Sequence, residues 1–336
     1  MTITDQETED RIDDGATVPT DPTVVEADGP SNWQQSIEGE WYGTPSVFDA
    51  EGNHTGFIKV NRSSVFEDGT TTYFMHTLFD NDGPLRSRFE FVEFAFEVLD
   101  SDANRIYMGP DFIGAGHPYG NLVDAHYYSP AWRADLRTMV HVIDDNQTQV
   151  YSSLLYDGPT LFAVFNGVYK VAFDYETNAA TRATIDEFCA GERVAGRRPH
   201  DLPAKQSGTW SGEIALWGPD QQQYGTATMC IVHEPITLLR TRQTIEITGD
   251  MDRRFVVERY HDGHRHTYDG PDLYGNAIAY GRASYSSLHA LGRAEKISGR
   301  DFLFDDERSL SIAWKFHDGD QMSTLAYGVL RWEPDA

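Results

Sequence analysis

An internal repeat constrains the fold of this 336-residue chain more than any other sequence feature. Gly39-Glu-Trp41-Tyr-Gly43 matches Gly208-Thr-Trp210-Ser-Gly212, with 169 residues between the two tryptophans. Later matches keep an offset of 161, so the second copy is shorter by eight residues. The pairs at this second offset are Tyr107-Met-Gly109-Pro110-Asp111 with Tyr268-Asp-Gly270-Pro271-Asp272, Tyr119-Gly120 with Tyr280-Gly281, Asp157-Gly158 with Asp318-Gly319, and Gly167-Val168 with Gly328-Val329. Two homologous domains follow from this repeat.

Both copies have the two-residue hydrophobic period of β-strands. Apolar and polar side chains alternate over 70–78, 90–98 and 161–171 in the first copy, and over 237–248 and 324–332 in the second. Asp-Gly turn signals separate many of these runs. Short alternating runs divided by turns are typical of all-β sandwiches and barrels. We therefore predict an all-β fold with two antiparallel barrels in tandem.

The composition along the chain sets the domain limits. Residues 1–32 are acidic and almost free of large apolar side chains, which predicts a disordered tail. The first β-barrel is expected at 33–178 and the second at 205–336. A linker at 179–204 joins them and contains a short predicted helix, 181–190.

The opening motif of each copy resembles that of a known superfamily. Gly-x-Trp-x-Gly at the start of a compact antiparallel domain is similar to the first strand of the calycin (lipocalin-like) barrels, in which the tryptophan fills the closed end. The tandem pair resembles carotenoid-hydratase-like and pericyclase-like proteins, and also uncharacterised two-barrel families. This resemblance implies two lipocalin-like barrels. It also implies a hydratase, dehydratase, isomerase or cyclase that acts without a cofactor on a terpenoid-like or polyketide-like substrate.

Charge and targeting signals narrow the class of partner. Asp and Glu number 53 against 27 Lys and Arg, a formal net charge of −26, which argues against binding nucleic acid or an anionic membrane. No apolar run is long enough to predict a transmembrane helix, and the N-terminus lacks the features of a signal peptide. Only Cys189 and Cys230 are present, which indicates reduced thiols and a cytoplasmic protein.

A candidate site is predicted where the two copies differ. His117 aligns with Ile278, and Asn121 aligns with Arg282, so the first copy carries more titratable groups in this stretch. The predicted catalytic residues are His117, His126, Tyr119 and Asp111, with Glu93 and Glu97 as further acids and His76 and His141 nearby in the pattern. Aromatic side chains would enclose the substrate, namely Tyr107, Tyr119, Tyr127, Phe94 and Phe96.

The chemistry expected of this site is acid–base catalysis. A His or Asp inside an apolar barrel has a pKa shifted by desolvation, which suits proton transfer near neutral pH. Other interpretations remain open. Asp111 follows Gly-Pro and is compatible with a turn cap. Glu93 and Glu97 share one strand face, which points either inward or into the acidic surface. Both histidines could be surface groups or hydrogen-bonded core groups.

A second cluster offers a metal-binding alternative. His261, His264 and His266 lie within six residues, and imidazole is a common zinc ligand. The Asp-Gly between them also fits a hairpin turn with exposed histidines. No Gly-x-Ser-x-Gly, phosphate-binding loop or dinucleotide fingerprint occurs, so no cofactor is expected.

The sequence thus supports two functions for one small hydrophobic molecule. The first is a cofactor-independent enzyme, a hydro-lyase or isomerase, that uses His117 and His126. The alternative is a noncatalytic carrier or sensor with the same pocket. The sequence sets no oligomeric state.

Overall fold

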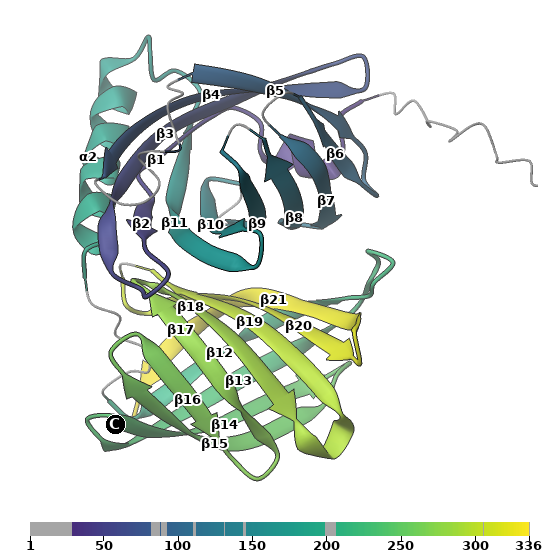
Figure 1. Cartoon of the computed structure of the whole chain (residues 1–336), viewed down its shortest axis with the longest axis vertical. Coiled ribbons are helices and arrows are strands. Elements are labelled where there is room, and N and C mark those ends of the chain that lie inside the picture. The colour runs from purple at the N-terminus through teal and green to yellow at the C-terminus, as the bar shows by residue number, and fades with distance from the viewer. Residues whose placement is uncertain are drawn as a thin grey trace, which may run out of the picture.

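A computed structural model describes residues 29–81, 88, 93–109, 112–130, 132–143, 146–198, 206–304 and 306–335. These residues form two antiparallel β-barrels that follow one another along the chain, as Figure 1 shows. The predicted all-β class and the tandem arrangement are confirmed. Most of the predicted acidic tail, and most of the segment that joins the barrels after residue 198, lie outside the described residues.

The first barrel closes through a strand that is interrupted. β1 and β2 both pair with β3 and with β11, so the two short strands together occupy one position in the sheet. Pro45 lies in the break, where the missing N–H removes no ladder bond. The strands are β1 (Glu40–Gly43), β2 (Ser46–Phe48), β3 (His54–Glu67), β4 (Thr70–Asn81), β5 (Glu93–Asp100), β6 (Arg105–Met108), β7 (Ile113–Tyr119), β8 (Leu122–Ser129), β9 (Ala134–Ile143), β10 (Thr148–Asp157) and β11 (Thr160–Ala172).

The second barrel closes without a break, because β12 pairs with both β13 and β21. A single 3₁₀ turn, η1 (Leu291–Arg293), interrupts the run of hairpins. The strands are β12 (Gly208–Trp217), β13 (Gln223–Thr237), β14 (Arg240–Gly249), β15 (Arg253–Asp262), β16 (Arg265–Asp269), β17 (Leu273–Tyr280), β18 (Ala283–Ala290), β19 (Glu295–Leu303), β20 (Ser309–Asp318) and β21 (Gln321–Pro334).

The repeated tryptophans occupy matching positions in the two barrels. Trp41 and Trp210 are each only 1% exposed. The indole Nε1 of Trp41 donates a hydrogen bond to the Ile37 carbonyl at 2.8 Å. Position 43, two residues after Trp41, requires glycine, because a Cβ there would lie 2.7 Å from the Tyr169 ring. The motif therefore serves close packing at one end of the barrel.

Two α-helices accompany the first barrel. α1 (Asn32–Ser36) precedes β1, and Ser31 caps it by accepting a hydrogen bond from the Gln34 amide. α2 (Ala179–Ala195) contains the predicted helix 181–190 and runs along the outside of the first barrel (Figure 1). It buries Ile185 and Cys189 against that barrel.

The repeated Tyr-Gly pairs form the contact between the barrels. Gly120 lies in the β7–β8 turn with φ of 58°, and a Cβ there would lie 2.8 Å from the Trp217 ring. Gly281 lies in the β17–β18 turn with φ of 59°, and its Cβ would lie 2.6 Å from the Phe48 ring. Phe48 and Trp217 are themselves 169 residues apart. Each barrel therefore seats the same turn against the same strand position of the other.

Hydrogen bonds repeat this reciprocal arrangement. The Tyr327 hydroxyl donates to the Tyr119 carbonyl at 2.6 Å, and Asn166 Nδ2 donates to the Tyr280 carbonyl at 3.0 Å. Tyr327 and Asn166 occupy equivalent positions at the offset of 161. Reciprocal contacts of this kind define an isologous interface, here between two copies within one chain.

One buried ion pair at this interface has no counterpart in the repeat. Arg282 Nη2 lies 2.6 Å from Glu192 Oε2 of α2, and both side chains are 7% exposed. The same carboxylate accepts a hydrogen bond from the Val168 amide at 3.1 Å. Asn121 stands at the equivalent of Arg282 in the first copy. This sequence difference therefore serves the packing of the two barrels.

Candidate functional site

The interior of the first barrel holds an aromatic-lined cavity of about 110 Å³. Eight of the ten strand positions, together with α1, contribute side chains that border it. Because strand side chains alternate, these residues follow the period-two pattern of the sequence. The cavity has hydrophobic walls and few polar groups, which is typical of small-molecule sites.

Aromatic rings form one wall of this cavity. Phe112 is central, with its ring centroid 5.0 Å from that of Phe96, 5.3 Å from Tyr127 and 5.1 Å from Trp132. Phe94 lies 5.9 Å from Trp132 in an edge-to-face arrangement. These separations fall in the range that favours aromatic pairs, so the wall is well packed on itself.

The closed end of the cavity is formed by α1. Trp33 of this helix and Ile37, its C-cap residue, are 4% and 2% exposed and border the cavity. Gln34 ties the helix to the barrel, because its amide donates to Ser64 Oγ at 2.8 Å and accepts from the Tyr73 hydroxyl at 3.0 Å.

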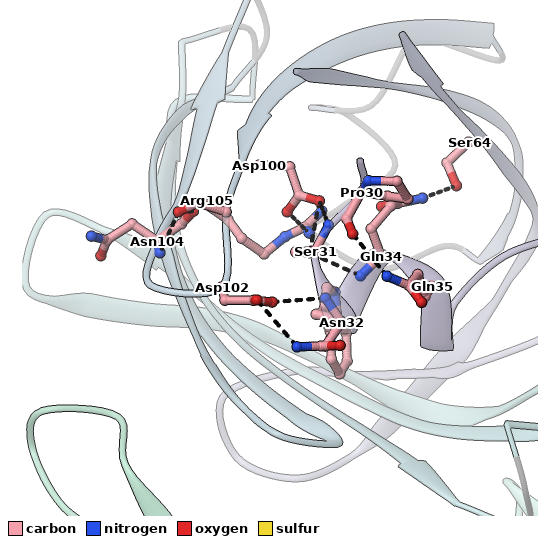
Figure 2. A network of polar contacts seen from close by, with 12 residues as sticks. Pro30, Ser31, Asn32, Gln34, Gln35, Ser64, Asp100, Asp102, Asn104 and Arg105 are labelled. Atoms are coloured by element: carbon pink, nitrogen blue, oxygen red, sulfur yellow. Dashed lines mark hydrogen bonds and ion pairs between the residues drawn. The ribbon is translucent and has the colours of Figure 1, made fainter. Parts of the chain in front are cut away.

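A buried ion pair anchors the start of the same helix, as Figure 2 shows. Asp100 pairs with Arg105 and accepts a hydrogen bond from Ser31 Oγ at 2.7 Å. Arg105 also donates to the Tyr73 hydroxyl at 2.6 Å. Asp102 holds the next residue by accepting from the Asn32 amide at 2.7 Å. These contacts fix the floor of the cavity.

The polar groups that border the cavity are hydroxyls and one guanidinium. Burial raises the pKa of Tyr73 to about 12 and holds the pKa of Tyr127 and Tyr169 well above the ordinary value. These phenols therefore stay protonated near neutral pH. Thr138 Oγ1 donates to the Tyr127 hydroxyl at 3.0 Å, which places a hydroxyl pair on the wall. Arg62 supplies the positive charge.

The predicted enclosing aromatics lie mostly where the sequence places them. Phe94, Phe96, Tyr107 and Tyr127 all border the cavity. Tyr119 does not, because it is buried between the barrels with its ring 6.2 Å from that of Trp217.

The two predicted acids of β5 lie on the outer face of the barrel. Glu93 and Glu97 are exposed, since Phe94 and Phe96 of the same strand point inward. The Glu93 carboxylate lies 3.4 Å from His76 Nδ1, and both side chains are more than half exposed. Of the two orientations that the sequence left open, the structure has the outward one.

The predicted histidines are dispersed. The His126 side chain is 63% exposed and lies 3.8 Å from Asp135. His117 is partly buried on the outer face of β7, opposite Asp124 of β8. His141 is buried between the barrels, with Nδ1 2.9 Å from Ser311 Oγ. Burial, assisted by the positive charge of Arg300, lowers the pKa of His141 to about 3.

The structure therefore does not bring the predicted catalytic groups together at the cavity. None of the described ones borders it, and Asp111 lies outside the described residues. Their proposed acid–base role stays a prediction.

The three histidines of the metal-binding alternative also serve other contacts. His266 lies inside the second barrel, where Arg259 Nε donates to its Nδ1 at 2.9 Å. His264 lies at the barrel interface, close to Gly52. Over the residues that the structure describes, no three His, Cys, Asp or Glu side chains cluster in a way that could hold a metal ion.

The second barrel is filled where the first is hollow. A void next to Trp210 and Trp314 in its interior is only about 20 Å³. Asp301 accepts a hydrogen bond from Trp314 Nε1 at 2.8 Å, and burial raises the pKa of this carboxyl. His233 is bonded to Gln243 at 2.9 Å, and burial lowers its pKa to about 3.

Sequence reasoning named only four of the residues that border the cavity, and Phe112, Trp132 and Arg62 are among those that it missed. Phe112 and Trp132 each come two residues after a proline in the sequence, where the alternation of strands gives no signal. Arg62 lies in a polar stretch of β3 that looks solvent-facing in the sequence. Its alignment with Ile231 of the second copy, 169 residues later, could have singled it out.

Comparisons with known proteins support the fold. A protein of unknown function from the DUF3598 family of Nostoc punctiforme is similar with a TM-score of 0.59 at 11% identity, over 92% of this chain and all of that one. A putative outer membrane protein from Bacteroides fragilis covers 90% of this chain and all of its own at 10% identity, but its TM-score of 0.23 carries no argument. No protein-family model and no curated protein matches the sequence. In the described part of the chain, no helix is long and apolar enough to cross a membrane.

Proposed function

We propose that the first barrel binds a small apolar molecule with about one aromatic ring. The observation that carries this proposal is the contrast between two homologous interiors: the first holds an aromatic-lined cavity of about 110 Å³, and the void beside Trp210 and Trp314 in the second is about 20 Å³. Native interiors are close-packed, so a void of the larger size is unusual. Burial of an apolar ligand there would replace lost packing contacts.

The size of the cavity favours a compact ligand. An engineered cavity of about 150 Å³ lined by apolar side chains accepts benzene. A volume of about 110 Å³ therefore suits a single ring better than an extended carotenoid-like chain. The aromatic wall around Phe112 would stack against such a ring.

Binding fits the chemistry of the cavity better than acid–base catalysis does. Among the described side chains that border it there is no His, Asp or Glu, and Tyr73 is held protonated by burial. We therefore favour the carrier or sensor hypothesis. The hydratase or isomerase function implied by the resemblance to carotenoid-hydratase-like proteins stays a prediction, and loss of turnover in His117→Ala and His126→Ala would support it.

Calorimetric titration with toluene, phenol and indole tests the proposal. We expect saturable binding to the unaltered protein and its loss in Ala125→Phe, which places a ring inside the cavity. Ala115→Phe is the matched control, because Ala115 lies on the neighbouring strand β7 and faces outward. Absence of binding to the unaltered protein, or unchanged binding to a folded Ala125→Phe, would contradict the proposal.

A further inference from the structure

Arg62 is the one charged side chain among the described residues that border the cavity. It lies on β3 next to Trp41, its register partner on β1, and so near the closed end of the barrel. A cation in a largely apolar space is costly unless an anion or several acceptors compensate it. The contacts of Arg62 therefore indicate what this cavity is built to hold.

The described protein supplies Arg62 with a neutral acceptor only. Its Nη2 donates to Gln149 Oε1 at 2.7 Å, and its guanidinium lies 5.8 Å from the Tyr73 ring centroid. No carboxylate of the described residues lies within ion-pair distance of it. Among the buried arginines, Arg105 pairs with Asp100 and Arg282 pairs with Glu192. Arg259 and Arg300 are also buried and, like the partly exposed Arg62, form no ion pair with a described residue.

Gln149 adds an independent observation at the same place. It is 0% exposed, and its Nε2 has no hydrogen-bond partner although it is buried. A buried amide donor without an acceptor is destabilising. Arg62 borders the cavity, and Gln149 lies behind it, in contact with its guanidinium but not itself on the cavity wall. The N–H groups of Arg62 suit an anion.

The second barrel supports a functional origin for this pair. Ile231 stands at the equivalent of Arg62, and Leu310 stands at the equivalent of Gln149, at the offsets of 169 and 161. Both are buried apolar residues of a packed interior. The barrel scaffold therefore does not need the arginine or the glutamine, and the two occur together only in the hollow copy.

We propose that the ligand of the first barrel is a small aromatic carboxylic acid, whose carboxylate accepts hydrogen bonds from Arg62. Its ring lies against the aromatic wall of Phe94, Phe96 and Phe112. Arg62 is then a specificity-determining residue, because an arginine offers two parallel N–H groups that match a carboxylate. This inference rests on the proposed function and adds the chemical class of the ligand.

The test compares two probes of equal shape, phenylacetate and its neutral isostere phenylacetamide, by calorimetric titration. We expect the unaltered protein to prefer phenylacetate. Arg62→Met should weaken phenylacetate binding by about ten- to a hundredfold, the range of a charge-assisted hydrogen bond, and should change phenylacetamide binding far less. Arg62→Lys should restore part of the preference, and Arg137→Met, on the exposed face of β9, should leave both affinities unchanged.

The outcomes separate this inference from the proposed function. Equal affinity for the two probes, or a ratio that Arg62→Met does not alter, would overturn the carboxylate assignment while the barrel still binds a ring. If Arg62 were only structural, Arg62→Met would lower thermal stability and leave the ratio of the two affinities unchanged. Failure of every ring-containing probe to bind would overturn both proposals.

Discussion

The two barrels share strand order, closing motif and interface turns, yet their interiors differ. Ser153 of the first barrel corresponds to Trp314 of the second, and Val140 corresponds to Asp301. In the second barrel the Trp314 indole occupies the interior and bonds to Asp301 at 2.8 Å. In the first barrel the smaller Ser153 is buried with its Oγ 2.9 Å from Thr138 Oγ1, and Val140 borders the cavity. A small number of interior substitutions thus separates a solid barrel from a hollow one.

This difference teaches which repeated residues carry function. The features that the copies share, such as Trp41, Gly120 and their equivalents, close a barrel or join the two barrels. The features that differ inside the barrels, such as Arg62 and Val140, border the cavity. Three predictions test this division.

The largest effect is expected from Trp314→Ser, which gives the second barrel the residue of the first. The change removes a buried indole and leaves the Asp301 carboxylate without its donor, so the free energy of unfolding should fall by about 4 kcal/mol. Phe112→Ala in the first barrel borders an existing void and should cost only about 2 kcal/mol. Urea denaturation followed by circular dichroism measures both changes. Equal costs would contradict the contrast between a solid and a hollow interior.

An intermediate effect is expected on acidification. The pKa of His141 at the interface and that of His233 in the second barrel are about 3, because burial disfavours their charged forms. Below an unfolded pKa of about 6.5 the unfolded chain takes up protons that the folded chain does not, so stability falls as the pH falls. Each histidine should cost about 2 kcal/mol at pH 5.

His141→Phe isolates one of these two groups. Phe302 stands at the equivalent position of the second copy and is buried, so a phenyl ring is compatible with this place in the fold. The variant should lose less stability between pH 7 and pH 5 than the unaltered protein does. Thermal unfolding across this range measures the difference, and an unchanged slope would show that His141 titrates normally.

The smallest effect is expected from a pair of glycine substitutions in the first barrel. Gly120 and Gly158 have φ of 58° and 55°, so Ala strains both turns by a similar amount, about 1 kcal/mol. At Gly120 the Cβ would also meet Trp217 at 2.8 Å, whereas at Gly158 nothing lies within 4 Å. Gly120→Ala should therefore cost about 1–2 kcal/mol more than Gly158→Ala. Equal melting temperatures would show that the barrel interface tolerates displacement of this turn.

The sequence was a good guide to the fold because its signals are local or periodic. Alternation identified the strands, and the repeat identified two copies of one sheet. The same alternation, once Phe94 and Phe96 are placed inward, also sets Glu93 and Glu97 outward.

The site was harder to predict because differences between copies have several physical causes. The stretch around His117 and Asn121 differs from its copy, but Arg282 at the position of Asn121 serves the ion pair with Glu192. The volume of an interior depends on residues that lie far apart in the chain, such as Arg62 and Val140. No local pattern reports that volume.

The reciprocal seating of the two Tyr-Gly turns has a consequence for the evolution of the chain. Each barrel provides the surface against which the Tyr-Gly turn of the other packs. Substitutions on these two surfaces are therefore constrained as long as the barrels stay in contact. The closely packed second barrel then stabilises the first through their shared interface. Because these contacts stabilise the first barrel from outside, its interior can be less closely packed and can hold a cavity.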